Sequence, residues 1–416
     1  MLKKTRNDWL MLISALLVTA AMLLLVFAST AGGFGEWYRA SVYPLLQGSL
    51  GRLSGAVPFS VAELLCIVLP FIIIYDLYDI LRRSGEDRKC GMPEPRTGQA
   101  GIRLNRFLKR LMLLAALLFF LYEACCGVNY HSDPFVPRDV YDSASFTVEQ
   151  LAEFCEYTAG ELKTIYTESY DYSESASETE SNSKSESVSG TEYKSENAAG
   201  LGREYIFLSY PEWSVIAETA VDAMEELGHE YPELSGYYPR PKKITLLSRL
   251  FSMMGVSGIY SPFTIEANVN GEMEGMEKPF TACHELSHLR GYMNEGEANY
   301  IGWLACIGSE DRSFNRSGWL IAWIYAGRSL RQADPELYEK IRAQIPEAAL
   351  AEIRANDEFW AKHENKASEV QSRINDAYLK SNGVEEGIAS YGQLTTLMLH
   401  WYFAEGSSRI ADKTVN

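Results

Sequence analysis

Apolar residues are concentrated in three long runs near the start of the chain, at about residues 9–29, 61–81 and 107–128. A helix needs about 20 consecutive apolar residues to cross the hydrocarbon core of a bilayer. The first run is longer than the core of a cleaved signal peptide, and further runs follow it, so we expect an uncleaved anchor. The pattern predicts three transmembrane helices, with residues 1–128 as a membrane anchor and the lipid bilayer as a partner.

Basic residues are distributed unequally between the connections of these three runs. The first connection, about 31–58, holds only Arg39 and Arg52. The second connection and the start of the third run hold Arg82, Arg83, Arg88, Lys89, Arg96, Arg103, Arg106, Lys109 and Arg110. Because basic loops stay in the cytoplasm, we expect a multi-pass protein of the cell membrane with a cytoplasmic N-terminus. Residues 129–416 then form an extracytoplasmic domain.

Helical periodicity dominates this second part of the chain. The segments with apolar positions at helical spacing are 146–163, 213–227, 281–290, 295–307, 319–330, 335–380 and 393–403. Residues 167–200 are rich in Ser and Glu and hold almost no large aliphatic side chain, which predicts a disordered insertion. We expect an α+β fold that is predominantly α-helical, with a small β-sheet next to the helix at 281–290.

Two segments predict the strands of that sheet. Residues 243–247 read Lys-Ile-Thr-Leu-Leu, follow a break at Pro239-Arg-Pro241, and could form a short strand. Residues 262–270 alternate strictly, with Phe263, Ile265 and Val269 among the apolar positions and with polar residues between them. Such alternation is typical of a half-buried strand. If this strand lies at an edge of the sheet, an extended peptide could pair with it.

Residues 284–288 read His-Glu-Leu-Ser-His, and this motif carries the clearest chemistry in the chain. Two histidines four residues apart project from one face of a helix and can bind one Zn2+. Glu285, between them, can then act as general base on a water molecule. The absence of Pro and Gly from 281–290 favours a helix, and Gly291 is suited to end it.

A third metal ligand must come from outside this helix. Glu295 and Glu297 both follow the predicted turn, and we favour Glu295 because its spacing from Asn299 puts the two on one helix face. Asn299 could then orient a ligand histidine. Cys283 is next to the motif but faces another side of the helix, so we expect a small buried residue. Tyr391 and His400 are candidate donors to a developing oxyanion, although packing roles are an alternative for both.

Composition narrows the choice of partners. The chain has 416 residues, 47% of them apolar, and a formal net charge of −17, which argues against nucleic-acid binding. Its seven cysteines show neither the spacing of a zinc site nor that of a disulfide scaffold.

The chain resembles a bacterial family of membrane-anchored, zincin-like metallopeptidases whose physiological role is unknown. The resemblance lies in the three apolar runs and in the segments 258–270, 279–288, 295–300, 378–383 and 390–392, with Gly291. It implies a gluzincin-like site, with His284 and His288 as zinc ligands, a glutamate as third ligand and Glu285 as catalytic acid and base.

The leading hypothesis is therefore a membrane-tethered zinc peptidase that hydrolyses a peptide or protein substrate outside the cytoplasmic membrane. The alternative is a non-catalytic envelope sensor or scaffold that uses the same ligands for a structural Zn2+. A hydrolase of a non-peptide amide is a third option. The sequence leaves the substrate and the oligomeric state open.

Overall fold

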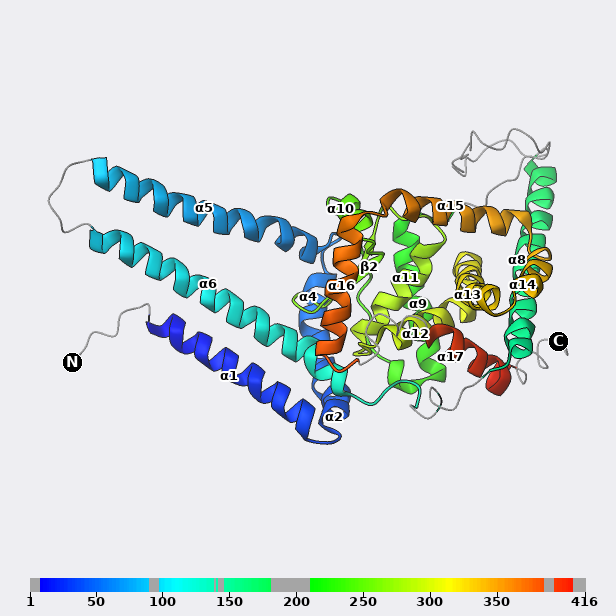
Figure 1. The fold of residues 1–416 in the computed structure, drawn as a ribbon, viewed down its shortest axis with the longest axis horizontal. Helices are drawn as coiled ribbons and strands as arrows, with labels where there is room; N and C mark the ends of the chain where they lie inside the picture. Colours follow the sequence, from blue (N-terminus) through cyan, green and yellow to red (C-terminus); the bar gives the residue numbers. More distant parts are fainter. Residues whose placement is uncertain are drawn as a thin grey trace. The chain divides into compact units, whose positions relative to one another are not determined.

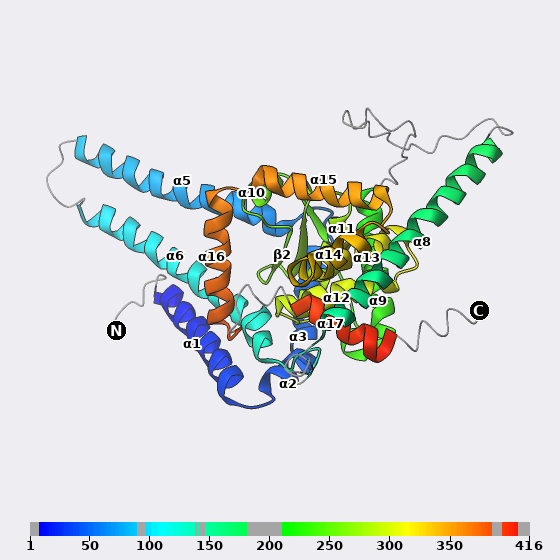
Figure 2. The same ribbon diagram turned by 45° about the vertical axis from the view of Figure 1, so that its right-hand side comes forward.

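The computed structural model describes residues 8–89, 97–137, 140, 146–180, 210–384 and 393–406. It is mostly helical, with one three-stranded sheet (Figures 1 and 2). The chain is divided into two compact units. The anchor unit comprises Met1–Asp133, Tyr260–Glu266 and Leu289–Met293, and the helical unit comprises the rest. Two short segments from the second half of the chain therefore belong with the N-terminal helices.

The three predicted spans are confirmed as helices long and apolar enough to cross a membrane. They are α1 (Asp8–Thr30), α5 (Val61–Lys89) and α6 (Thr97–Cys125). In the anchor unit, α6 packs along α1 and also contacts α5 (Figure 1). Asp76 of α5 forms an ion pair with Arg110 of α6, at 3.5 Å.

Short helices fill the connections at one end of these spans. They are α2 (Phe34–Ser41), α3 (Tyr43–Leu46), the π-helix η1 (Gln47–Gly51), α4 (Arg52–Gly55) and, after α6, the 3-10 helix η2 (Gly127–His131). The ends of α1 and α6 lie side by side next to α2 and η2, in both views (Figures 1 and 2).

Two buried hydrogen-bond groups tie residues 260–266 into the anchor unit. The hydroxyl groups of Tyr43 and Tyr260 lie 2.9 Å apart, and the Tyr260 hydroxyl donates to the carbonyl oxygen of Cys125 at 2.9 Å. The Glu266 carboxylate accepts hydrogen bonds from the backbone N–H groups of Val61 and Ala62 at 3.1 and 2.8 Å. These amides are at the start of α5, where the first N–H groups have no partner within the helix. The carboxylate accepts their hydrogen bonds, and its negative charge interacts favourably with the positive end of the helix dipole.

The helical unit is built around buried apolar helices. Among its elements, α13 packs against both α8 and α12, and α17 covers α12 and α13. The helices are α8 (Val148–Glu180), α9 (Trp213–Glu230), η3 (Pro232–Leu234), α10 (Ser248–Met253), α11 (Glu277–Leu289), α12 (Glu295–Gly308), α13 (Arg312–Ala333), α14 (Pro335–Arg342), α15 (Glu347–His363), α16 (Lys366–Ser381), α17 (Gln393–Trp401) and η5 (Tyr402–Gly406). Trp303 is fully buried at the centre of this packing, with edge-to-face contacts to Trp319 and Trp401.

The sheet has the order β1-β3-β2, with β1 (Lys242–Ile244) parallel to β3 (Glu266–Asn270). A turn at 262–265 joins β2 (Gly258–Ser261) to β3. The predicted strand at 243–247 is found one residue earlier and is shorter. The predicted strand at 262–270 is confirmed only from Glu266, and Ile265 in the turn has a positive φ of 52°.

The expectation of a half-buried strand was wrong, and the condition for peptide pairing, an edge position, is not met by β3. All five residues of β3 are buried, and the strand is central, so its neighbours β1 and β2 form the edges. The polar side chains are buried because they find partners. Asn270, for example, donates to the Ser252 hydroxyl and the Val256 carbonyl at 3.0 and 3.1 Å. Period-2 alternation does not separate a solvated polar face from a buried, hydrogen-bonded one.

The Ser/Glu-rich segment 167–200 also needs a correction over its first part. Helix α8 continues through it to Glu180. This stretch lacks Gly and Pro, and extending a helix that is already nucleated costs much less than starting one. Residues 181–200 lie outside the described residues, so the expectation of disorder stays a prediction there.

Candidate metal centre

The two histidines of the motif lie on α11, as their spacing predicts. His284 and His288 are both buried, with relative exposures of 8% and 7%, and Glu285 between them is exposed by only 3%. The helix ends where the sequence predicts, because Gly291 has a φ of +89° that suits the residue after a helix C-terminus. The motif is therefore presented from one well-packed helix.

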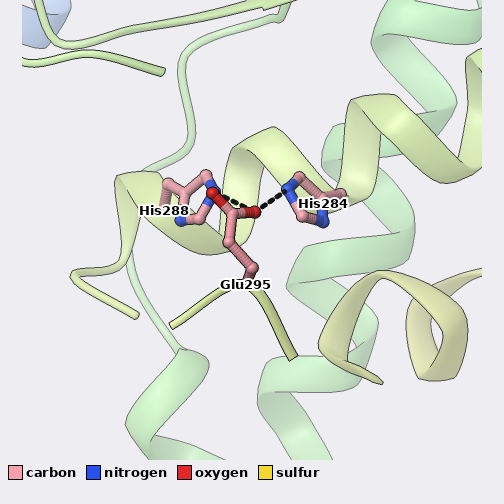
Figure 3. Close-up of side chains that lie close together, drawn as sticks. All are labelled: His284, His288 and Glu295. Carbon is pink, nitrogen blue, oxygen red and sulfur yellow. Dashed lines mark ion pairs between the residues drawn. The ribbon is translucent and has the colours of Figure 1, made fainter. Parts of the chain in front are cut away.

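The next helix brings a carboxylate back to this face. Asn294 caps α12, and its side-chain oxygen accepts hydrogen bonds from the backbone N–H groups of Gly296 and Glu297 at 2.8 and 3.2 Å. The cap fixes the first turn of α12, and Glu295 is the first residue of that turn. Its side chain lies between the two histidines (Figure 3).

The three side chains converge closely. Oε2 of Glu295 lies 3.2 Å from Nε2 of His284 and 3.7 Å from Nε2 of His288. One ligand atom from each of the three residues lies within 4.8 Å of the others. The imidazole rings are nearly perpendicular, at 87°, with centroids 4.8 Å apart. Two imidazole nitrogens and one carboxylate oxygen are a donor set that Zn2+ accepts, so these residues fit the expected metal.

Glu297 lies elsewhere, which bears on the choice between the two glutamates. Its Oε1 accepts a hydrogen bond from the backbone N–H of Phe135 at 2.8 Å. The Phe135 ring in turn packs near the rings of Tyr231 and Tyr300. Glu295 thus lies beside the histidines, whereas Glu297 forms a hydrogen bond with the backbone at Phe135. Metal ligation by Glu295 itself stays a prediction.

Electrostatics around the three residues suit a metal ligand set. Burial lowers the pKa of His284, so its imidazole stays neutral. Burial alone would raise the pKa of Glu295, but hydrogen bonds with His284 and His288 hold it well below its usual range. Neutral imidazole and ionised carboxylate are the forms that bind a metal ion.

The carboxylate of Glu285 has a different environment from that of Glu295. Burial raises its pKa to about 8, with the charge of Glu295 adding to the shift and His288 opposing it. Its Oε2 has no hydrogen-bond partner among the described residues. Gly258 of the edge strand β2 lies against the same carboxylate, because a Cβ at that position would stand 2.5 Å from Oε1. A raised carboxyl pKa and a free oxygen are what a general base and acid near neutral pH requires.

Other predicted residues are distributed as follows. Asn299 is buried on α12, but its Nδ2 and the Nδ1 of His284 have no hydrogen-bond partner among the described residues, so its orienting role stays a prediction. Cys283 is fully buried, as expected. Tyr391 lies outside the described residues, and His400 is in α17 with partial exposure.

Sequence reasoning missed Tyr325 on α13. Burial raises its pKa to about 12, and the negative charges of Glu277 and Glu295 contribute to that shift. No pattern in the sequence connects α13 with the motif, because the proximity arises only from helix packing.

Comparison with curated proteins returned no match, and comparison with solved structures returned none either. The model of one protein family matches residues 38–399, which is most of the chain. That match includes the last two candidate spans, the sheet, α11 and α12. The chain therefore belongs to the family described as "Protein of unknown function (DUF3810)".

Proposed function

We propose that this protein is a membrane-tethered zinc peptidase with a zincin-like domain. The observation that carries the proposal is the convergence of His284, His288 and Glu295, with Glu285 on the same helix as the histidines. This combination matches the logic of a HExxH site, in which two histidines and a carboxylate hold the metal and the intervening glutamate handles protons.

The number of ligands favours catalysis over a purely structural metal. Structural zinc sites usually have four protein ligands, whereas catalytic sites have three and an open position. Within the described residues, the ligand group consists of His284, His288 and Glu295. Zn2+ bound there would supply a Lewis acid for the substrate carbonyl and lower the pKa of a water molecule.

Glu285 has the role of moving the proton. Its carboxylate takes a proton from the attacking water and later gives it to the leaving amine, so that one residue is first base and then acid. Burial favours the protonated form between these steps, which agrees with the raised pKa. The free Oε2 is available for this exchange.

The edge strand β2 offers a place for an extended substrate. It forms one edge of the sheet, and Gly258 on it lies directly beside the Glu285 carboxylate. Ile259, the next residue, is 47% exposed. A peptide that pairs with this edge would present its backbone carbonyl groups close to the general base.

We also propose that the site lies outside the cytoplasm. All basic residues between 61 and 128 lie in the sequence from 82 to 110, where α5 ends and α6 begins, and these two helix ends are on the same side in Figure 1. The start of α5 and the end of α6 lie at the other end, together with residues 260–266. The positive-inside rule places the basic end in the cytoplasm.

The test is an unbiased peptide-library digest by the full chain in lipid nanodiscs, with metal content measured in parallel. Glu285→Gln keeps the size of the side chain but removes the base, so we expect normal zinc content and a loss of cleavage of about 10²–10⁴-fold or more. Glu358→Gln, on the exposed surface of α15, is the matched control and should cleave normally.

Cleavage by Glu285→Gln at the wild-type rate would contradict the peptidase mechanism. Stoichiometric zinc with no cleavage by the wild-type chain would favour the sensor or scaffold, since that role needs the ligands but no base.

A further inference from the structure

The turn between α11 and α12 decides how Glu295 meets the histidines. Residues 290–293 form this inter-helix turn, which follows Leu289, the last residue of α11, and directly precedes the cap Asn294. The turn belongs to the anchor unit, together with the membrane helices. Its last residue, Met293, is joined through Asn294 to Glu295, the first residue of α12.

Gln47, which lies in the connection between the first two spans, forms a hydrogen bond with the turn. Nη1 of Arg290 donates a hydrogen bond to Oε1 of Gln47 at 3.0 Å, across 243 residues of sequence. The Gln47 side chain is almost fully buried, at 1% exposure. A hydrogen bond between a buried amide and a charged guanidinium contributes more to stability than one between two neutral groups.

Arg39 holds the next residues of the turn. Its guanidinium lies over the Tyr292 ring, 4.1 Å from the centroid, and its Nε and Nη2 both donate hydrogen bonds to Oε2 of Glu36, at 3.1 and 2.6 Å. Its aliphatic part fills the space above Gly291, where a Cβ would stand 3.0 Å from Arg39 Cγ. Gly291 is therefore required both by its positive φ and by this close approach.

The end of α6 completes the support. The Cys126 thiol lies 3.7 Å from the Met293 sulfur, and both residues are buried. Asn129 lies beside Gly291, since a Cβ on the glycine would come 3.3 Å from Asn129 Cγ. Each part of the turn after Leu289 thus touches a residue that belongs to the membrane anchor.

We propose that Arg39 and Gln47 are positioning residues that set the approach of Glu295 to His284 and His288. The inference rests on the proposed metal site for its functional meaning. Ligand geometry tolerates errors of only about 0.5 Å, and groups that orient ligands typically change metal affinity by about 10–100-fold. The membrane anchor is then part of the metal site's construction as well as its tether.

The experiment uses the full chain in nanodiscs with Gln47→Ala and Arg39→Ala. Ser49→Ala is the control, because its exposed hydroxyl donates to the carbonyl oxygens of Leu45 and Leu46 in the preceding helical turn. Gln47→Glu is the rescue variant, since it keeps an acceptor for Arg290. The first measurement is amide hydrogen exchange across 289–300 in the metal-free protein. The second is Zn2+ affinity by chelator competition, with the d–d spectrum of the Co2+ form.

In the metal-free protein, we expect exchange across the turn to rise about tenfold or more in both alanine variants and to stay unchanged in Ser49→Ala and Gln47→Glu. The two alanine variants should also bind Zn2+ about 10–100-fold more weakly and show a shifted Co2+ spectrum. The protection of the α13 amides against hydrogen exchange should not change in these variants. This control distinguishes a local effect on the turn from a general loss of structure.

Unchanged exchange in folded Gln47→Ala and Arg39→Ala would overturn the proposal, whatever the metal does. Increased exchange with an unaltered Co2+ spectrum would overturn it as well, because the turn would then move without moving the ligands. A wild-type chain that binds no Zn2+ would refute the proposed function alone, and the exchange measurement would still decide whether these residues hold the turn.

Discussion

Gly302 of α12 lies directly against the backbone of His284 on α11. A Cβ at Gly302 would stand 2.9 Å from the His284 nitrogen and 3.1 Å from its Cα, closer than a side chain can approach a rigid backbone. The absence of a side chain at 302 therefore lets α11 and α12 come close enough for Glu295 to reach the two histidines.

Gly302→Ala should force α11 and α12 apart. Overpacking of this kind typically costs about 1–3 kcal/mol, and we expect that loss in thermal unfolding together with a clear drop in zinc content. Gly308→Ala is the matched control at the end of the same helix, where a Cβ meets nothing within 4 Å. Equal zinc content in both variants would show that the helix contact does not control the site.

Removing either histidine should remove the metal. His284→Ala and His288→Ala each leave two of three ligands, so we expect loss of stoichiometric zinc and a lower unfolding temperature, because metal binding contributes to folding stability. A chelator should lower the unfolding temperature of the wild-type chain and leave that of the variants unchanged. His363→Ala, which loses a contact to the Phe359 carbonyl on α15, should keep full zinc content. Full occupancy in the double histidine variant would refute the assignment.

The two glutamates should have separable effects. Glu295→Ala should lose zinc affinity, because its carboxylate oxygen lies between the imidazole nitrogens. Glu297→Ala should keep zinc but lose stability, since the Phe135 N–H loses its acceptor, a change worth about 1–3 kcal/mol when buried. Metal analysis and denaturant unfolding distinguish the two. Zinc loss in Glu297→Ala with normal zinc in Glu295→Ala would reverse the assignment.

Topology is tested with reporter fusions. A reporter active only outside the cytoplasm should be active when fused after residue 140 and silent when fused near residue 95, because the basic end of the spans should stay inside. The opposite result would place the histidine motif in the cytoplasm. A reporter fused within 31–58 should behave like the fusion after 140.

The local elements of this protein could be predicted from the sequence. The three spans follow from continuous apolar runs, and the helix at 284–288 follows from residues that favour a helix and from Gly291, which ends it. The spacing of the two histidines on one face follows from the helix period alone. Each of these features depends on residues within a few turns of one another, which is the range that a pattern describes.

Only the tertiary structure decided the rest. The choice of Glu295 over Glu297 as the neighbour of the histidines depends on a cap at Asn294 and on a backbone amide at Phe135, far away in the sequence. The central position of β3 depends on which strands pair with it, and the alternation of its residues carries no information about that pairing. The hydrogen bond between Gln47 and Arg290 joins two residues that are 243 positions apart in the sequence. Contacts at such separation leave no periodic signal, because they arise when distant segments pack to bury their apolar surface and satisfy their buried polar groups.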